Sequence, residues 1–364
     1  MNRSTSDKGI RRNRTRQVRV GNIGVGGKAP VSVQTMTKTD TRDVRSTVAQ
    51  IREVQALGCD IVRLAVPDEA AARALGRIRK QVTIPLIADI HFDHRLALIA
   101  LGAGIDGLRI NPGNIGSMAK VKEIVAAARE RKVPIRIGVN SGSLEKDIAR
   151  KHGGATPGAL VESALRHVHI LEDLNYREIK ISAKASDVQR TIETYRLLAA
   201  KTKYPLHLGV TEAGTLLPGT VRSSVAMGIL LSEGIGDTIR VSLTDTPAKE
   251  VKVGLELLRS LGLREPGPNV ISCPTCGRIQ VDVMGVAQEI ETELEKHFIA
   301  HPKAPRPVVA VMGCMVNGPG EAQHADIAIA GGKGKFALYV RGKLVKTIPQ
   351  SKAAQLALAC VKQW

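Results

Sequence analysis

The sequence is poor in aromatic residues and contains no long hydrophobic run. Aromatic residues make up 2% of its 364 residues, whereas proteins that bind single-stranded nucleic acids usually stack the bases on aromatic side chains. This shortage argues against that class of function. The longest apolar stretch, around residues 308–316, is too short to cross a bilayer, which takes about 20 apolar residues in a helix. We expect a soluble protein with no nucleic acid and no membrane among its partners.

The N-terminus lacks the features of an export signal. Residues 1–21 are rich in Arg and Lys but contain no apolar segment of the kind found in signal peptides. We therefore expect residues 1–20 to form a basic solvated tail and the protein to remain in the cytoplasm. Five cysteines in such a chain favour metal binding or redox chemistry over a framework of disulfides.

Acidic residues are scarce relative to basic ones. The chain has 53 Lys and Arg against 34 Asp and Glu, a net charge of +19. This excess favours an anionic partner such as a nucleic acid, an acidic lipid or a phosphorylated small molecule. Because aromatic residues are so few, a phosphate ester is the favoured choice.

Eight short apolar runs alternate with helical patterns through the first two thirds of the chain. Apolar residues three and four apart, as at Val48, Ile51 and Val54, give each helix one apolar face. Eight strand–helix units predict an α/β fold, a (β/α)₈ TIM barrel over residues 21–264, with a short hairpin within residues 17–32. The predicted strands are residues 31–36, 60–66, 84–90, 106–111, 133–139, 177–182, 204–210 and 237–243.

A second domain is expected after the barrel. The stretch 263–272 is rich in Pro and Gly, as is typical of a boundary, and residues 265–364 then form a small α+β domain. Its predicted elements are a helix at 283–297, strands at 308–312, 326–330 and 336–348 with a turn at Arg341-Gly342, and a terminal helix from Lys352.

Polar residues interrupt the predicted barrel strands in a regular way. Within a strand they lie an even number of positions apart, so their side chains point to the same face. If that face is the interior, they meet at the carboxyl rim, where barrel enzymes keep their active sites. So many cations there predict a substrate with several phosphate charges. The set is Arg63, Asp89, His91, Arg109, Asn111, Arg136, Asn140, Lys180, Ser182, Lys184, His207, Thr211, Arg240 and Ser242.

A carboxylate, Glu212, follows the seventh predicted strand. A carboxyl group of raised pKa at this rim suits a general acid. A salt bridge from Glu212 to a neighbouring arginine is the alternative.

Three cysteines form the second chemical motif. Cys273 and Cys276 make a CxxC, and Cys314 follows a predicted strand. A structural zinc site would take its fourth ligand from His297, His301 or His324. A [4Fe–4S] cluster with three thiolates would leave one iron for another ligand, for which the oxygen of Glu321 is suited. Cys59 and Cys360 are expected to be buried side chains without chemistry.

Six motifs in this order give the chain a family resemblance: ADIHFD, LRINPGNIG, IRIGVNSGSLEKD, HLGVTEAG, CPTCGR and GCMVNGPGE. They closely resemble the 4-hydroxy-3-methylbut-2-enyl diphosphate synthases of the non-mevalonate isoprenoid pathway, in the two-domain bacterial form. The resemblance covers nearly the whole chain.

The resemblance implies a reductive ring opening of 2-C-methyl-D-erythritol 2,4-cyclodiphosphate with two electrons from a [4Fe–4S] cluster. It implies that Cys273, Cys276, Cys314 and Glu321 hold the cluster and that Glu212 donates a proton. The barrel arginines, with Lys180 and Asn140, would hold the diphosphate. Flavodoxin or ferredoxin would supply electrons to a head-to-tail homodimer, in which the cluster domain of one subunit closes over the barrel mouth of the other.

Two other functions account for part of the pattern. A nucleic-acid-binding protein with a zinc-bound CxxC would explain the charge but not the polar residues of the strands. A phosphate-binding barrel lyase or isomerase with a structural zinc would explain the barrel mouth but leave the cysteines incidental.

Overall fold

The computed structural model of the chain describes residues 10–265, 267–301, 303–314, 316, 320 and 323–364. The chain divides into two compact units, Met1–Arg264 and Glu265–Trp364. No helix in the described ranges has both the length and the apolar character needed to cross a membrane.

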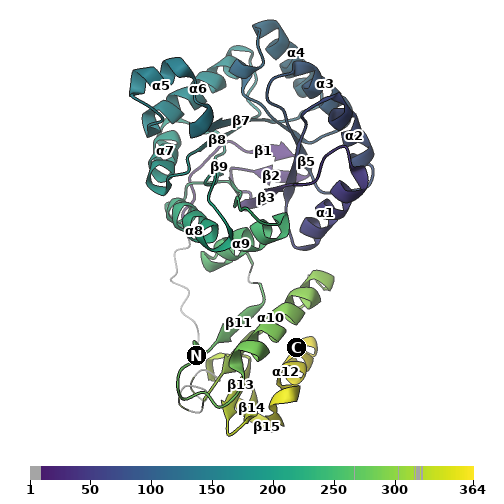
Figure 1. Ribbon diagram of the computed structural model, residues 1–364, viewed down its shortest axis with the longest axis vertical. Helices are drawn as coiled ribbons and strands as arrows, with labels where there is room; N and C mark the ends of the chain where they lie inside the picture. The colour runs from purple at the N-terminus through teal and green to yellow at the C-terminus, as the bar shows by residue number, and fades with distance from the viewer. Residues whose placement is uncertain (1–9, 266, 302, 315, 317–319, 321–322) are drawn as a thin grey trace. The chain divides into compact units, whose positions relative to one another are not determined.

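The first unit is a barrel of eight parallel strands inside a ring of helices (Figure 1). The sheet order is β8-β7-β6-β5-β4-β3-β10-β9, and a parallel bridge between Ile181 and Leu206 joins its two ends. The predicted TIM barrel is confirmed. Each strand overlaps its predicted run, and β7 and β8 extend one and two residues beyond the ends of theirs. The strands are β3 Ser32–Met36, β4 Ile61–Ala65, β5 Leu86–Asp89, β6 Gly107–Arg109, β7 Ile135–Asn140, β8 Ile179–Lys184, β9 His207–Leu208 and β10 Thr238–Ile239.

Several outer helices begin with an aspartate. Asp43, Asp68 and Asp187 accept hydrogen bonds from backbone N–H groups of the first turn, and losing such a cap costs about 0.5–2 kcal/mol. The helices are α1 Val44–Ala56, α2 Glu69–Arg79, α3 His94–Gly102, α4 Met118–Glu130, α5 Lys146–His152, α6 Pro157–Asp173, α7 Val188–Lys201, α8 Leu216–Ser232 and α9 Pro247–Ser260, with short 3₁₀ turns η1 Pro112–Asn114 and η2 Ser141–Ser143.

The apolar core of the barrel lies between the strands and the helices, while much of the interior is polar. Barrel interiors are normally filled by branched apolar side chains. Here Gln34, Arg136, Lys180 and His207 are all at most 1% exposed. Polar groups at this depth require hydrogen-bonding partners or charges to compensate for their lost hydration. This interior is therefore built for something other than packing.

The amino end of the barrel is closed by a hairpin. Strands β1 (Val18–Val20) and β2 (Ile23–Val25) pair antiparallel, and their valines pack with Ile61 and Ile87 in one buried apolar cluster. The predicted hairpin is confirmed.

The basic segment before the hairpin contacts the barrel through Arg12 and Thr15. Arg12 forms an ion pair with Asp237 at 2.8 Å, and Thr15 donates to the same carboxylate at 2.9 Å. The prediction of a solvated tail is therefore wrong for these residues, because a buried carboxylate at the barrel end binds them.

The second unit is a five-stranded sheet with two helices. The order is β11-β12-β13-β14-β15; β11, β12 and β13 are parallel, and β14 is antiparallel to both its neighbours. Apolar residues of α10 and α12 share one core with the sheet, around Ile290, Ala357 and Phe336. The elements are β11 Asn269–Ser272, α10 Val283–Ala300, β12 Val308–Met312, β13 Ile327–Gly332, β14 Lys335–Val340, β15 Lys343–Pro349, η3 Gln350–Lys352 and α12 Ala353–Lys362.

The predicted helices and strands of this unit are confirmed, but one strand was missed. Residues 263–272 were expected to form a domain boundary without a strand, whereas Asn269–Ser272 is strand β11, parallel to β12. The strand is short and mostly exposed, so it lacks the apolar pattern that identifies a buried strand.

Candidate active site at the barrel mouth

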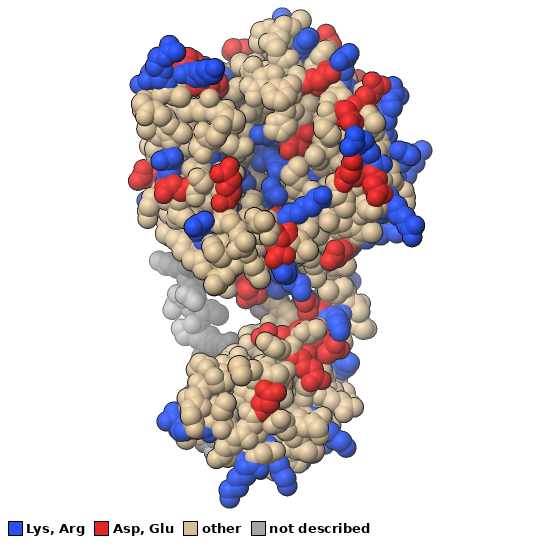
Figure 2. All heavy atoms as spheres, viewed as in Figure 1, with Lys and Arg blue, Asp and Glu red and all other residues tan. Residues whose placement is uncertain are grey.

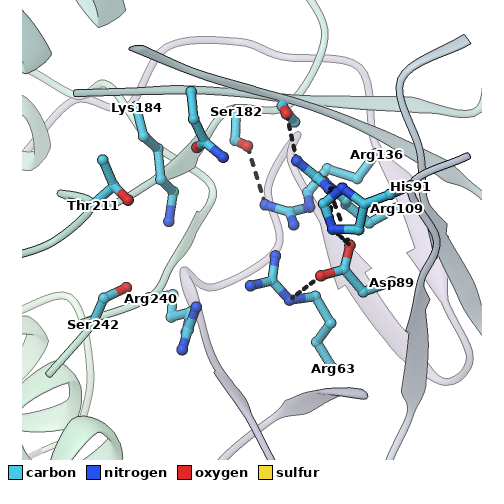
Figure 3. Close-up of a pocket in the computed structure, with 12 residues that line it drawn as sticks. Arg63, Asp89, His91, Arg109, Arg136, Ser182, Lys184, Thr211, Arg240 and Ser242 are labelled. Carbon is cyan, nitrogen blue, oxygen red and sulfur yellow. Dashed lines mark hydrogen bonds and ion pairs between the residues drawn. The ribbon is translucent and has the colours of Figure 1, made fainter. Parts of the chain in front are cut away.

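A cavity of about 230 Å³ opens at the carboxyl ends of the barrel strands. Figure 3 shows its side chains pointing toward one another from both sides of the barrel. Its lining includes five cationic side chains and one carboxylate. The lining residues are Arg63, Asp89, His91, Arg109, Arg136, Gly138, Asn140, Ser182, Lys184, Thr211, Arg240 and Ser242.

Asp89 is the carboxylate around which part of the cavity is organised. Its oxygens lie 3.7 Å from Arg63 Nε and 3.3 Å from Arg109 Nη1. Burial by itself raises the pKa of Asp89, but attraction to Arg63, a hydrogen bond from His91 and attraction to Arg109 outweigh it and hold the pKa well below its usual range. Asp89 is therefore ionised at neutral pH, and it positions two guanidinium groups.

Gly138 gives the Arg109 side chain room to cross the barrel. A Cβ at position 138 would lie 2.5 Å from Arg109 Nε, and Arg109 Nη2 donates to the Gly138 carbonyl at 2.7 Å. Asn111 donates to the same carbonyl at 3.1 Å and accepts from the Gly138 N–H at 2.9 Å. Asn111 thus fixes strand β7 instead of lining the cavity.

The remaining cations lie deeper and repel one another. Arg136 and Lys184 are 1% and 6% exposed, and the pKa of each is lowered by burial and then by neighbouring cations. Arg240, whose pKa is lowered to about 10 by burial first and then by Arg63, has an ion pair to Glu250 at 3.4 Å. Two carboxylates do not balance this set, so an anion entering the cavity would relieve the repulsion.

Lys180 and His207 lie inside the barrel without lining the cavity. Both are essentially unexposed, and Lys180 Nζ and both ring nitrogens of His207 have no hydrogen-bond partner among the described residues. Burial, followed by the charge of Arg136, lowers the pKa of Lys180 to about 7. Burial and then Lys184 lower the pKa of His207. Both side chains therefore lose their proton more readily than they would in water.

Glu212 lies at the rim beside Thr211, which lines the cavity. Its backbone is left-handed, with φ +53°, and its side chain is exposed. No ion pair to Glu212 forms within the described part of the chain, so the alternative of a salt bridge gains no support there.

Sequence reasoning missed two residues of this site. Gly138 was overlooked because a glycine without a side chain gives no polar signal. Glu250 is 2% exposed and accepts hydrogen bonds from Thr35 Oγ1 at 2.8 Å and from the Leu243 N–H at 3.0 Å. Glu250 could have been noticed in the sequence because it is a charged residue beside the apolar positions of α9.

The small unit brings two cysteine loops to the same end of its sheet. β11 and β12 are parallel neighbours with Ser272 opposite Val311, so Cys273 and Cys314 follow strands that end side by side. The chain after the CxxC folds back on the second loop, because Gln280 N–H donates to the Gly313 carbonyl at 3.4 Å.

The three thiols suit a soft metal centre by their chemistry, and Cys273 and Cys314 follow neighbouring strand ends. None of the five cysteines, all of them described, forms a disulfide. Cys276 is exposed, and Cys273 and Cys314 are partly buried. Within the described ranges, no three His, Cys, Asp or Glu side chains are arranged to hold a metal ion, and Glu321, the predicted fourth ligand, lies outside those ranges.

The candidate histidines for a zinc site are not placed near these loops. Helix α10 starts at Val283, which contacts Gly313, and His297 follows fourteen residues later, about 20 Å along the helix axis. His301 lies farther still. His324 precedes β13, whose opposite end, at Gly331, is the one close to Gly313.

The other two cysteines pack against apolar cores. Cys59 is 6% exposed, and burial raises the pKa of its thiol to about 12. Cys360 is partly buried against the helix–sheet core of the small unit.

Comparisons with known proteins agree along nearly the whole chain. Residues 15–255 match the GcpE TIM-barrel domain and residues 269–363 match the GcpE protein C-terminal domain. Two similar relatives, both named 4-hydroxy-3-methylbut-2-en-1-yl diphosphate synthase (flavodoxin), come from Geobacter sulfurreducens and Thermodesulfovibrio yellowstonii. The first is 58% identical over 96% of this chain and 98% of its own length, and the second is 54% identical over 94% and 97%.

Solved structures give a more distant likeness. A dihydropteroate synthase of Xanthomonas albilineans covers 69% of this chain and 100% of its own, at 14% identity and a TM-score of 0.48, which is too weak to indicate function. The family models and the curated relatives, in contrast, span both units. The chain therefore belongs to the GcpE family, and its relatives are 4-hydroxy-3-methylbut-2-en-1-yl diphosphate synthases.

Proposed function

We propose that the chain converts 2-C-methyl-D-erythritol 2,4-cyclodiphosphate to (E)-4-hydroxy-3-methylbut-2-enyl diphosphate, the product for which its relatives are named. The cyclic substrate takes up two electrons and two protons, C–O bonds break, and the linear allylic diphosphate and one water are formed. The observation that carries the proposal is the cavity at the barrel mouth, where five cations surround one carboxylate in a barrel of this family.

The cations are suited to hold the diphosphate. Planar guanidinium groups such as Arg109, Arg136 and Arg240 can each donate two parallel hydrogen bonds to phosphate oxygens. A diphosphate also offsets the mutual repulsion of these buried cations. The neutral groups of Asn140, Ser182, Thr211 and Ser242 line the same cavity and can bind the hydroxyl groups of the substrate.

Glu212 is proposed as the proton donor. Its exposed carboxyl follows Thr211 at the rim, where a carboxylic acid can reach a substrate held by the cations. General acid catalysis requires such a group within hydrogen-bond reach of the atom that accepts the proton.

The residues proposed to hold a [4Fe–4S] cluster are Cys273, Cys276, Cys314 and Glu321. Such a cluster supplies electrons at low potential. The cysteines follow paired strand ends and are not used in disulfides, which supports this assignment. We further propose flavodoxin, named in the relatives, or ferredoxin as electron donor, a homodimer as the active form and the cytoplasm as the location.

The test is anaerobic turnover. Protein purified without oxygen should be brown and contain iron, and with dithionite and methyl viologen it should convert the cyclic diphosphate to the linear product, identified by mass spectrometry. A colourless protein with stoichiometric zinc would favour the barrel lyase or isomerase instead. Iron-loaded protein that leaves the substrate unchanged would contradict the proposal.

A further inference from the structure

The last part of the chain contains no acidic residue. Residues 327–364 form β13, β14, β15 and α12, and their charged side chains are Lys333, Lys335, Arg341, Lys343, Lys346, Lys352 and Lys362. The acidic residues of the small unit gather instead on α10, at Glu289, Glu291, Glu293 and Glu295. In the small unit, Figure 2 shows Lys and Arg over the part that holds β14 and β15 in Figure 1. The cationic side chains are therefore concentrated on the part of the small unit formed by residues 327–364.

Strand register places one end of this segment beside the cysteine loops. β13 runs parallel to β12, so its last residues lie at the same end of the sheet as Cys314. A Cβ at Gly331 would lie 3.1 Å from the carbonyl oxygen of Gly313. Lys333 N–H donates to Gln280 Oε1 at 2.6 Å. The turn at residues 333–335 thus packs against the loop that follows the CxxC.

A mixed apolar and cationic surface surrounds this end of the sheet. Ile279 and Met284 are 37% and 64% exposed beside the loop. Lys335 pairs with Pro349, and Gln350 Oε1 accepts from the Asp282 N–H at 2.9 Å, which brings η3 to the same end. We name this the cysteine-end surface; it consists of Arg278, Ile279, Met284, Lys333, Lys335 and Lys352, all exposed.

Asp282 is the nearby described carboxylate. It accepts the Gly285 N–H at 2.9 Å as the cap of α10, so it serves the helix and does not balance the lysines. An apolar centre with a charged rim is the usual composition of a protein interface. The net positive rim selects a partner that presents carboxylates.

We propose that the cysteine-end surface is the docking site for an acidic electron-carrier protein, such as the flavodoxin named in the relatives. The inference rests on the proposed function, because a reductive reaction requires a carrier that comes close to the cysteines. Complexes of electron-transfer proteins are small and transient, and they depend on charge attraction that steers the encounter and weakens with salt.

The test compares two pairs of charge reversals in the full-length, iron-loaded protein. The first variant carries Lys333→Glu and Lys335→Glu at the cysteine end. The matched control carries Lys343→Glu and Lys346→Glu on β15, with the same change in net charge but starting at the opposite end of the sheet. Each is assayed with reduced flavodoxin and, separately, with dithionite and methyl viologen, which need no docking site.

The Lys333/Lys335 variant should show a rise of roughly tenfold or more in the apparent KM for flavodoxin and a weaker dependence on salt. Its turnover with dithionite and viologen should stay unchanged, and the control should behave like the parent protein with both reductants. The docking site would be overturned if both variants lost flavodoxin-dependent activity equally, or if the Lys333/Lys335 variant lost none. It would also be overturned if that variant lost activity with dithionite and viologen.

A binding measurement without turnover separates this inference from the proposed function. The affinity for flavodoxin, followed by its flavin fluorescence at two salt concentrations, should weaken in the first variant and not in the control. If the parent protein bound flavodoxin in this way but never converted the cyclic diphosphate, the proposed reaction would be wrong while the docking site stood.

Discussion

Lys180 should gain a proton when an anion enters the barrel mouth. The side chain is 1% exposed, its Nζ has no partner among the described residues, and burial followed by the charge of Arg136 lowers its pKa to about 7. An anion bound above it favours the charged form and raises the pKa. Since a group at its pKa is half protonated, about half a proton per anion should be taken up at pH 7.

Sulfate is a suitable probe because it does not titrate near pH 7. Proton uptake is measured in unbuffered solution as sulfate is added, with chloride at equal ionic strength as reference. His207, Lys184, Arg136, Arg240 and Asp89 also face the barrel interior or its cavity, so the informative quantity is a difference between variants. Lys180→Met should reduce the uptake at pH 7 by about half a proton, and Lys201→Met, on the exposed part of α7, should not.

The same substitution should change stability in a pH-dependent way. The pKa of Lys180 is about 7 in the folded protein and about 10.4 unfolded, so the unfolded chain binds more protons between these values. The free energy of unfolding therefore rises with pH across this window, and the burial penalty is largest below pH 7, on the order of 5 kcal/mol. Lys180→Met should raise Tm more at pH 6 than at pH 10. An equal Tm change at both pH values, or unchanged proton uptake, would refute the reasoning.

Two further predictions follow from close contacts and from the cysteine loops. Gly138→Ala should weaken sulfate binding by about 1–3 kcal/mol, the cost of a disrupted charged hydrogen bond, because its Cβ would lie 2.5 Å from Arg109 Nε; calorimetry should show no such loss for Gly142→Ala, where nothing lies within 4 Å. Cys273→Ala should lose iron and visible absorption, whereas Cys59→Ala should keep both; iron retained in full after the first substitution would contradict the ligand assignment.

The inward face of the barrel could be predicted because strand geometry leaves little freedom. Side chains two apart share a face, so Arg109, Arg136 and Arg240 could be assigned to one mouth from their positions alone. How deep each side chain lies inside the barrel could not be predicted in the same way. Lys180 and Lys184 share that face, but only Lys184 lines the cavity, because strand tilt and stagger set the height of each residue in a closed barrel.

Other features depend on contacts that a sequence does not reveal. Asn111 has the same parity as Arg109, yet its amide pairs with the backbone of Gly138, which depends on the register of β6 against β7. Arg12 was assigned to a tail because its partner, Asp237, is 225 residues away in the chain. Strand β11 lies at the edge of its sheet, so its residues are mostly exposed and do not form the apolar run that identifies a buried strand.

The most direct test of the account is a single turnover followed by ³¹P NMR. Anaerobic protein reduced in advance is mixed with the cyclic diphosphate, and we predict one linear diphosphate for every two electrons consumed. Arg136→Ala, with the same iron content, should need roughly 5 to 150 times more substrate, which corresponds to about 1–3 kcal/mol of lost binding. Unchanged phosphorus signals with fully iron-loaded parent protein, or equal substrate affinity in the variant, would contradict it.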